Sequence, residues 1–176
     1  MRITIRQEVT SDFAAVFDLI AEAFSTELLS DHQEQFLVER LRRSNAFIPE
    51  LSLVAEDGSQ VVGHILLTKL QIRNNDKVFD SLALAPVSVH PDYQKRGIGA
   101  LLIGRAHQVA KELGYQSIVV LGHENYYPKF GYQPCAHFGI ELPFDVPPGN
   151  CMAIELVNGG LKGISGMVDY PGEFYE

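Results

Sequence analysis

Hydrophobic residues near the N-terminus recur with two different periods. Polar and apolar residues alternate from Ile3 to Gln7, as they do in a strand with one buried face. The Thr-Ser-Asp stretch at 10–12 then supplies side-chain oxygens and a carboxylate that favour a helix start. Beyond it the apolar residues fall three and four positions apart, which predicts a helix that packs on the core through Phe13, Val16, Phe17, Ile20 and Phe24.

The next predicted elements are a second helix and a hairpin. Two apolar, strand-like runs flank the dipeptide at 57–58, Asp-Gly, which favours the positive backbone angles of a tight hairpin turn. Before this hairpin, a more polar helix is predicted from about residue 31 to residue 43. Its inward face consists of Phe36, Leu37 and Leu41.

A strand, a helix and a second strand are predicted in the middle of the chain. The first strand covers 79–89 and contains Pro86, which cannot donate a hydrogen bond and therefore predicts a bulged or unpaired position. A buried strand follows the helix at 117–122. This order requires two parallel strands with a right-handed crossover. Gly114 closes the helix, whose buried face is predicted to contain Leu102, Ala106, Val109 and Leu113.

The remaining sequence is less regular, and the bulk composition is that of a globular protein. A late strand is predicted at 151–156, followed by a glycine-rich tail at 156–176 that packs on the domain or on a partner. A length of 176 residues suits a single domain, 1–176. No apolar run reaches the roughly 18 residues of a membrane span, and the first nine residues lack a secretory signal, so we expect a cytoplasmic protein with no membrane role.

Cysteine content and charge exclude further classes. Cys135 and Cys151 form no CxxC pair, and no histidine cluster has metal-ligand spacing, so we expect neither a metal site nor a disulfide framework. Both cysteines are interpreted as small buried hydrophobic residues. The formal net charge of -8 disfavours nonspecific nucleic-acid binding.

The stretch YQKRGIGA, at 93–100, indicates an anion site. If a helix begins near Ile98 or Gly99, its first N–H groups lack helical acceptors and point into the preceding turn. Gly97 permits backbone angles and close approaches that other residues resist, while Lys95 and Arg96 add positive charge. A phosphate group fits this description. A ligand-free, tight joint between strand and helix is the structural alternative.

Two familiar phosphate motifs fail at this turn. A dinucleotide fingerprint would place Gly or Ala at Leu102 and an acidic residue near the end of the next strand, where the sequence is VVLG. A nucleoside-triphosphate loop would place Lys and Ser or Thr after the second glycine, where Ala100 and Leu101 stand. The ligand class therefore stays open on these grounds.

The stretch VSVHPDYQKRGIGALLI, at 87–103, resembles the coenzyme A pyrophosphate motif of the GNAT acetyltransferase superfamily, through Gln94, Gly97 and Gly99. A later stretch, NYYPKFGY, is similar to the second signature of the superfamily, in which Tyr127 precedes a Gly-aromatic pair. The resemblance covers nearly the whole chain and extends to the YhbS-like branch of predicted acetyltransferases. It implies a mixed α/β (α+β) fold: a strongly twisted, mostly antiparallel sheet with a splayed parallel strand pair, flanked by helices.

The resemblance also implies a function and a set of residues. The implied reaction transfers an acetyl group from acetyl-coenzyme A to a primary amine by direct attack in a ternary complex. Tyr127 would protonate or hydrogen-bond the leaving sulfur, and the backbone N–H of Val87 would receive the oxyanion. The implied cofactor-binding residues are Val87, Val89, Gln94, Lys95, Arg96, Gly97, Ile98, Gly99, Ala100 and Tyr127.

Several points stay open at the level of sequence. Many relatives carry a Glu in the strand before the glycine turn, but 81–89 contains no acid, so the general base could be His64, His123 or Glu124, acting through water, or water alone. Tyr127 could instead be a packed aromatic residue. The missing carboxylate also allows a noncatalytic acyl-coenzyme A binding or sensing module. The amine acceptor, small molecule or peptide, and the choice between monomer and homodimer are not determined.

Overall fold

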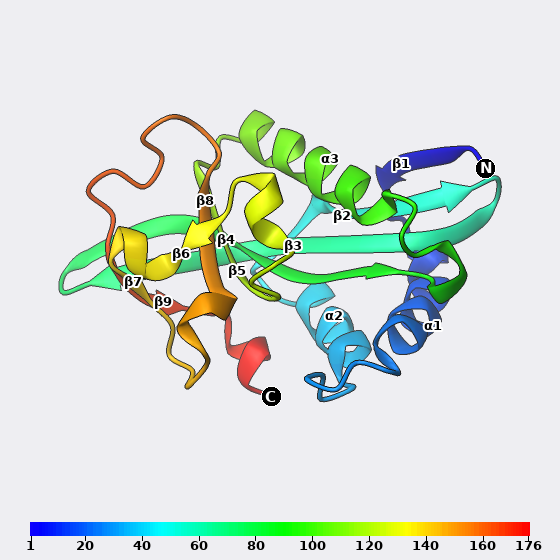
Figure 1. Ribbon diagram of the computed structural model, residues 1–176, viewed down its shortest axis with the longest axis horizontal. Helices are drawn as coiled ribbons and strands as arrows, with labels where there is room; N and C mark the ends of the chain where they lie inside the picture. The colour runs from blue at the N-terminus through cyan, green and yellow to red at the C-terminus, as the bar shows by residue number, and fades with distance from the viewer. The chain divides into compact units, whose positions relative to one another are not determined.

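A computed structural model describes residues 1–176 (Figure 1). The chain divides into two compact units. Unit 1 consists of Met1–Leu67 and Ala85–Val109, and unit 2 of Thr68–Leu84 and Ala110–Glu176. Three elements have residues in both units: strand β3 (Gln60–Asn74), strand β4 (Lys77–Val89) and helix α3 (Ile98–Glu112). The prediction that 1–176 folds as a single domain stays a prediction.

Unit 1 begins with the predicted strand and helices. Strand β1 (Ile3–Gln7) pairs antiparallel with β2 (Phe47–Asp57), and the hydrogen-bonded strand order is β1-β2-β3-β4. A 3-10 helix, η1 (Thr10–Asp12), leads into α1 (Phe13–Phe24), and α2 (Glu34–Arg42) follows. The predicted hairpin is confirmed, because β2 and β3 are joined at Gly58, whose φ is +63°.

The two helices of unit 1 differ in part from the prediction. Helix α2 begins at Glu34, three residues later than expected. The prediction that Phe36 faces the core is wrong, because this side chain is 39% exposed and the buried positions of α2 are Val38 and Leu41. The Phe36 ring instead lies edge-on against Phe17 of α1, with ring centroids 5.2 Å apart. An aromatic contact between helices thus takes the place of core burial.

Unit 2 contains the crossover and the rest of the sheet. Strands β4 and β5 (Ser117–Leu121) are parallel, with Leu82 opposite Ile118 and Leu84 opposite Val120, as predicted. This register ends two residues before Pro86. Strand β8 (Cys151–Glu155) pairs antiparallel with β5 and with the short strand β6 (Gln133–Pro134). The predicted fold class, a mixed and mostly antiparallel sheet with helices, is confirmed.

Helix α3 starts and ends close to the predicted positions. Leu102, Ala106 and Val109 are buried as expected, and Gly114 has the left-handed φ of +92°. The prediction for Leu113 is wrong: the helix ends at Glu112 and the Leu113 side chain is 44% exposed. A residue beyond the last helical turn no longer follows the helical spacing.

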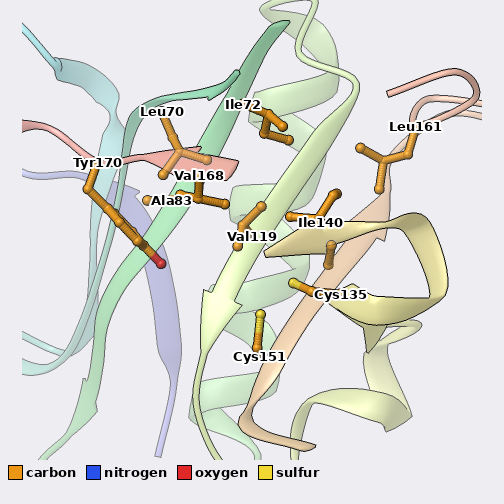
Figure 2. Close-up of a cluster of buried hydrophobic side chains, with 11 residues drawn as sticks. Leu70, Ile72, Ala83, Val119, Cys135, Ile140, Cys151, Leu161, Val168 and Tyr170 are labelled. Atoms are coloured by element: carbon orange, nitrogen blue, oxygen red, sulfur yellow. The ribbon is translucent and has the colours of Figure 1, made fainter. Parts of the chain in front are cut away.

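The C-terminal region is built into unit 2. Strand β9 (Gly166–Asp169) pairs antiparallel with β3 and parallel with β7 (Ile140–Glu141). Short 3-10 helices complete the unit: η4 (Cys135–Phe138), η5 (Pro148–Asn150) and η6 (Gly172–Tyr175). Figure 2 shows the buried core to which the tail contributes Leu161, Val168 and Tyr170.

The two cysteines belong to this core. Cys135 and Cys151 are free thiols, both buried, as the sequence predicted. The β6–β8 register places Pro134 opposite Met152, so Cys135 and Cys151 follow as neighbours across the two chain segments (Figure 2). The hydrogen bond with Cys151 and burial together raise the pKa of the Cys135 thiol well above its ordinary value. No helix is long and apolar enough to cross a membrane.

Candidate active site

The predicted anion cradle lies in unit 1, at the start of α3. The Leu101 N–H donates to the Gly97 carbonyl at 3.1 Å, so the helical ladder begins there. The N–H groups of Ile98, Gly99 and Ala100 precede this bond and have no acceptor within the helix. They form a positively polarised end that favours an anion.

The backbone conformation at position 97 requires a glycine. Its φ is +81°, a region that L side chains rarely adopt, and the space in which a Cβ would stand is open for at least 4 Å. Lys95 adopts a similar φ of +62° just before it. The chain therefore makes a sharp turn that leaves room beside the free N–H groups.

The polar residues of the cradle have separate partners. The Gln94 side-chain amide donates to the Val89 carbonyl at 3.2 Å, which ties the turn to the end of β4. Arg96 is exposed and its guanidinium carbon lies 5.4 Å from the centre of the Tyr93 ring. Lys95 is also exposed, so both cations can reach a bound anion from solvent.

Gly63 of β3 sets how closely α3 approaches the sheet within unit 1. A Cβ at this position would lie 3.0 Å from Leu102 Cδ1 and 3.2 Å from both Ile98 Cγ2 and Ala55 Cβ. Only a residue without a side chain lets the first turn of α3 lie this close to β3. Gly63 was not among the predicted site residues, although a single glycine within a predicted strand is a signal for such a close contact.

The end of β4 carries Val87 and Val89. Both residues are half-buried, whereas Ser88 between them is buried. His90 closes the strand: its N–H donates to the Val62 carbonyl at 2.9 Å, and its Nδ1 accepts from the Asp92 N–H at 3.2 Å. Its Nε2 lies 3.2 Å from a carboxylate oxygen of Glu22 on α1. His90 is thus a turn-fixing residue.

Tyr127 lies in unit 2, at the start of the 3-10 helix η3 (Tyr127–Phe130). Its side chain is buried between Tyr126 and Tyr132, with ring centroids 5.1 Å and 5.5 Å away. Gly122 makes room for the ring, because a Cβ there would stand 2.4 Å from Tyr127 Cε2. Gly122 was not among the predicted site residues either, although the sequence shows a glycine at the end of the predicted buried strand.

The protonation state of Tyr127 follows from its burial. Loss of solvent, and to a smaller extent the neighbouring Tyr126, raise the pKa of Tyr127 well above its ordinary value. The hydroxyl therefore stays protonated at neutral pH and can donate a proton or a hydrogen bond. Tyr127 is packed among aromatic rings, as the structural alternative stated, and its role as a donor to the leaving sulfur remains a proposal.

The three candidate bases have very different surroundings. His123 and Glu124 lie exposed in unit 2, in the loop between β5 and η3. His64 is fully buried in unit 1, and desolvation lowers its pKa to about 4. A histidine with this pKa is uncharged at neutral pH and is a weak base.

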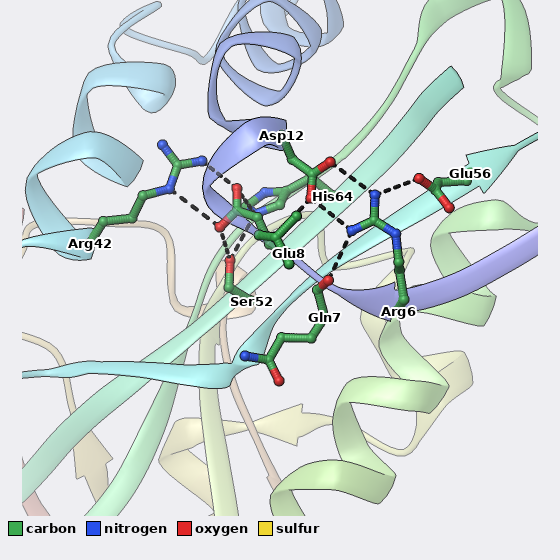
Figure 3. A network of polar contacts seen from close by, with 9 residues as sticks. Arg6, Gln7, Glu8, Asp12, Arg42, Ser52, Glu56 and His64 are labelled. Carbon is green, nitrogen blue, oxygen red and sulfur yellow. Dashed lines mark hydrogen bonds and ion pairs between the residues drawn. The ribbon is translucent and has the colours of Figure 1, made fainter. Parts of the chain in front are cut away.

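His64 belongs to a polar network that the sequence analysis did not find (Figure 3). Arg42 of α2 forms an ion pair with Glu8 at 2.5 Å, with only 7% and 1% of the two side chains exposed. The Ser52 hydroxyl donates to Glu8 at 2.6 Å and lies 3.2 Å from His64 Nε2. A second part of the network joins Arg6 to Asp12 and Glu56.

Local sequence carried little signal for this network, because its members come from four segments of the chain. The Arg6 guanidinium makes two bonds to the Asp12 carboxylate, at 2.7 and 2.9 Å, and this contact lowers the pKa of Asp12. No group of three or more His, Cys, Asp or Glu side chains is arranged to hold a metal ion.

Comparison with protein families identifies the class. The model of the acetyltransferase (GNAT) domain matches residues 4–135 of this chain. YjhQ of Escherichia coli K12, named an uncharacterised N-acetyltransferase, is 36% identical over 116 residues; the match spans 65% of this chain and 64% of YjhQ, just under two thirds of its length. YhbS of the same strain, also named an uncharacterised N-acetyltransferase, is 26% identical over 171 residues and 97% of both chains.

Solved structures agree with this match. The crystal structure of Escherichia coli YhbS in complex with CoA has a TM-score of 0.90 and 25% sequence identity, covering 100% of this chain and 93% of that one. A GNAT family acetyltransferase from Brucella melitensis, in complex with acetyl-CoA, has a TM-score of 0.79 and 28% identity, covering 98% of both chains.

The match to the acetyltransferase domain and the shared fold place this chain in a class of acyltransferases. More particularly, the chain belongs to the acetyltransferase (GNAT) domain family and is similar to YhbS along almost its whole length. The predicted family and enzyme class are therefore confirmed, and the predicted cosubstrate, acetyl-coenzyme A, is confirmed at the level of the family.

Proposed function

We propose that this protein transfers an acetyl group from acetyl-coenzyme A to a primary amine by direct attack in a ternary complex. The observation that carries the proposal is the cradle: three free N–H groups at the start of α3, beside open space at Gly97. A diphosphate fits this polarity and this space. Membership of the acetyltransferase family makes coenzyme A the source of that diphosphate.

The residues of unit 1 bind and orient the cosubstrate. Gly97, Ile98, Gly99 and Ala100 supply the N–H groups and the turn, while Lys95 and Arg96 add charge at the exposed rim. Gln94 holds the turn against the Val89 carbonyl. In this proposal the backbone groups of Val87 and Val89 pair with the amides of the pantetheine arm, as an added strand would.

Two groups of the chain take part in the chemistry. Acetyl-coenzyme A supplies an activated acetyl thioester. The Val87 N–H donates to the carbonyl oxygen as negative charge develops there. Burial raises the pKa of Tyr127, so its hydroxyl is protonated at neutral pH before the transfer. The hydroxyl donates a hydrogen bond or its proton to the leaving sulfur, and a proton given up in this step is replaced from solvent. His64 is enclosed and weakly basic, so the amine loses its own proton to water, either directly or with exposed His123 or Glu124 as the base.

Substitution of Gly97 tests the binding half of the proposal. Gly97→Ala places a side chain on a backbone with φ +81°, so the turn must change and the affinity for coenzyme A should fall about tenfold. Gly104→Ala is the matched control, since Gly104 lies exposed on the same helix, with no atom within 4 Å of its Cβ position. Calorimetry with coenzyme A measures both. Equal binding by Gly97→Ala and wild type would place the diphosphate elsewhere.

Substitution of Tyr127 tests the catalytic half. Tyr127→Phe keeps the ring in its aromatic cluster but removes the acidic proton, so kcat should fall roughly 100-fold while the Kd for coenzyme A changes less than about twofold. Tyr126→Phe is the control, because it removes a neighbouring hydroxyl. Thiol release in the presence of a panel of amines provides the readout. Unchanged turnover by Tyr127→Phe with a consumed acceptor would refute the assigned role.

A further inference from the structure

Two buried residues on neighbouring strands of unit 1, His64 and Ser88, each have one side-chain polar atom without a hydrogen-bond partner. His64 on β3 is fully buried, and its Nδ1 atom has no partner. Ser88 on β4 is 3% exposed, and its Oγ atom has none either. Buried polar atoms in folded proteins are nearly always hydrogen-bonded, so these two atoms require a physical explanation.

The polar network determines which of these atoms is a donor. The Glu8 carboxylate forms an ion pair with Arg42, and a carboxylate can only accept hydrogen bonds. The single proton of the Ser52 hydroxyl is therefore donated to Glu8, 2.6 Å away. The Ser52 oxygen then accepts from His64 Nε2, at 3.2 Å, so His64 carries its proton on Nε2. His64 Nδ1 is left as an acceptor without a donor (Figure 3).

The strand register brings Ser88 to the same place. The His90 N–H donates to the Val62 carbonyl, so these two residues face each other in an antiparallel ladder. Two positions further along, Ser88 stands opposite His64, on the same face of the sheet. Ser88 offers one O–H donor with no acceptor, and His64 offers one acceptor with no donor.

We propose that Ser88 and His64 form a positioning pair, joined by a hydrogen bond or through one enclosed water, that fixes the Val87–Val89 segment of β4. This inference rests on the proposed function, in which that segment pairs with the pantetheine arm. Each hydroxyl or ring N–H in this proposed chain donates to the next residue: Ser88 to His64, His64 to Ser52, and Ser52 to Glu8. Arg42 balances the charge of the Glu8 carboxylate at the end of the chain. The buried network thereby braces the strand that receives acetyl-coenzyme A.

Removal of the Ser88 hydroxyl gives the clearest test. If Oγ has no partner, Ser88→Ala leaves binding unchanged and the fold as stable or more so. If the pair exists, Ser88→Ala weakens the binding of acetyl-coenzyme A about tenfold, while kcat at saturating cosubstrate changes less than about threefold. Ser88→Thr keeps the hydroxyl and should bind within about twofold of wild type.

A matched control separates this effect from general loss of a buried hydroxyl. Thr68 is also fully buried on β3, and its Oγ1 likewise has no partner. It does not stand opposite Ser88 in the register, so Thr68→Val should leave the affinity for acetyl-coenzyme A unchanged. An equal loss of affinity in both variants would overturn the pairing.

The imidazole ring of His64 provides a second readout. In nitrogen-15 NMR spectra of the intact protein, Ser88→Ala should shift the Nδ1 resonance of His64 and leave its Nε2 resonance in place. An unmoved Nδ1 resonance together with wild-type affinity overturns the inference and leaves the proposed function intact. Absence of coenzyme A binding by the wild-type protein would instead overturn the proposed function.

Discussion

The two compact units differ in the charged groups that they bury, although both bury many apolar side chains. Unit 1 encloses an ion pair, a histidine and a serine in its polar network, whose bonds are directional and depend on charge. The core cluster of unit 2 consists of aliphatic, aromatic and thiol side chains, such as Ile140, Val168 and Cys135. The cradle for the proposed cosubstrate lies in unit 1, so the unit that encloses the ion pair also holds all of the proposed cosubstrate-binding residues except Tyr127.

The difference has an energetic meaning. A buried ion pair contributes little net stability relative to an apolar replacement, but it is costly to break and it enforces one geometry. An apolar core contributes stability in proportion to the area buried and tolerates small changes in shape. We therefore expect unit 1 to respond to loss of charge and to pH, and unit 2 to respond to loss of volume.

The largest effect should come from Arg42→Met. The substitution leaves the Glu8 carboxylate buried, with 1% of its side chain exposed, and without its cation. We expect a loss of about 3–5 kcal/mol in the free energy of unfolding, measured by urea denaturation. The double variant Glu8→Gln, Arg42→Met contains no unpaired charge and should recover part of this loss. A double variant no more stable than Arg42→Met would show that the charge is not the cause.

Acidification should destabilise the protein through His64. Desolvation lowers the pKa of His64 from 6.5 to about 4, so between these values the unfolded chain binds a proton that the folded protein does not. Stability should fall as the pH drops from about 6.5 to about 4, by at most roughly 3 kcal/mol, and this contribution should then level off.

The environment of His64 explains this direction. Glu8 and Asp12 favour the charged imidazole and Arg42 opposes it, but burial is the dominant effect. Urea midpoints at pH 7, 5.5 and 4.5 measure the slope. The His64→Gln variant has no group at position 64 that titrates between pH 4 and pH 7, so its stability should depend less steeply on pH. An equally steep dependence in this variant would assign the effect to other groups.

A smaller effect is expected from Ile140→Val in the core of unit 2. Ile140 is 2% exposed, and removal of one methylene from such a site costs about 1 kcal/mol. Because no carboxylate or histidine belongs to this cluster, the loss should be the same at pH 7 and pH 5. A loss that grows at the lower pH would contradict the contrast between the two units.

The smallest effect should come from Arg73→Met in unit 2. Arg73 and Asp169 form an ion pair at 2.7 Å, similar in length to the Arg42–Glu8 pair, but the side chains are 51% and 48% exposed. Water screens this pair, so the free energy of unfolding should change by less than about 1 kcal/mol. A loss comparable to that of Arg42→Met would mean that burial does not govern the cost.

Spacing along the chain predicted most elements of the fold. Strand β1, helix α1, the hairpin at Gly58 and the crossover through α3 follow from apolar periods and from glycine positions. The errors fall where local spacing stops governing burial. Phe36 obeys the helical period but contacts Phe17 at the surface, and Leu113 lies one residue past the end of α3.

The sequence by itself determined the cradle and the family signatures, because a positive φ at Gly97 and unpaired N–H groups at a helix start are local properties. Only the tertiary structure decided that Glu8, Arg42 and His64 share one buried network, and that Gly63 and Gly122 admit close neighbours. Those contacts join residues far apart in the chain. Burial of a charge or of a ring depends on what packs against it, and no local pattern records that packing.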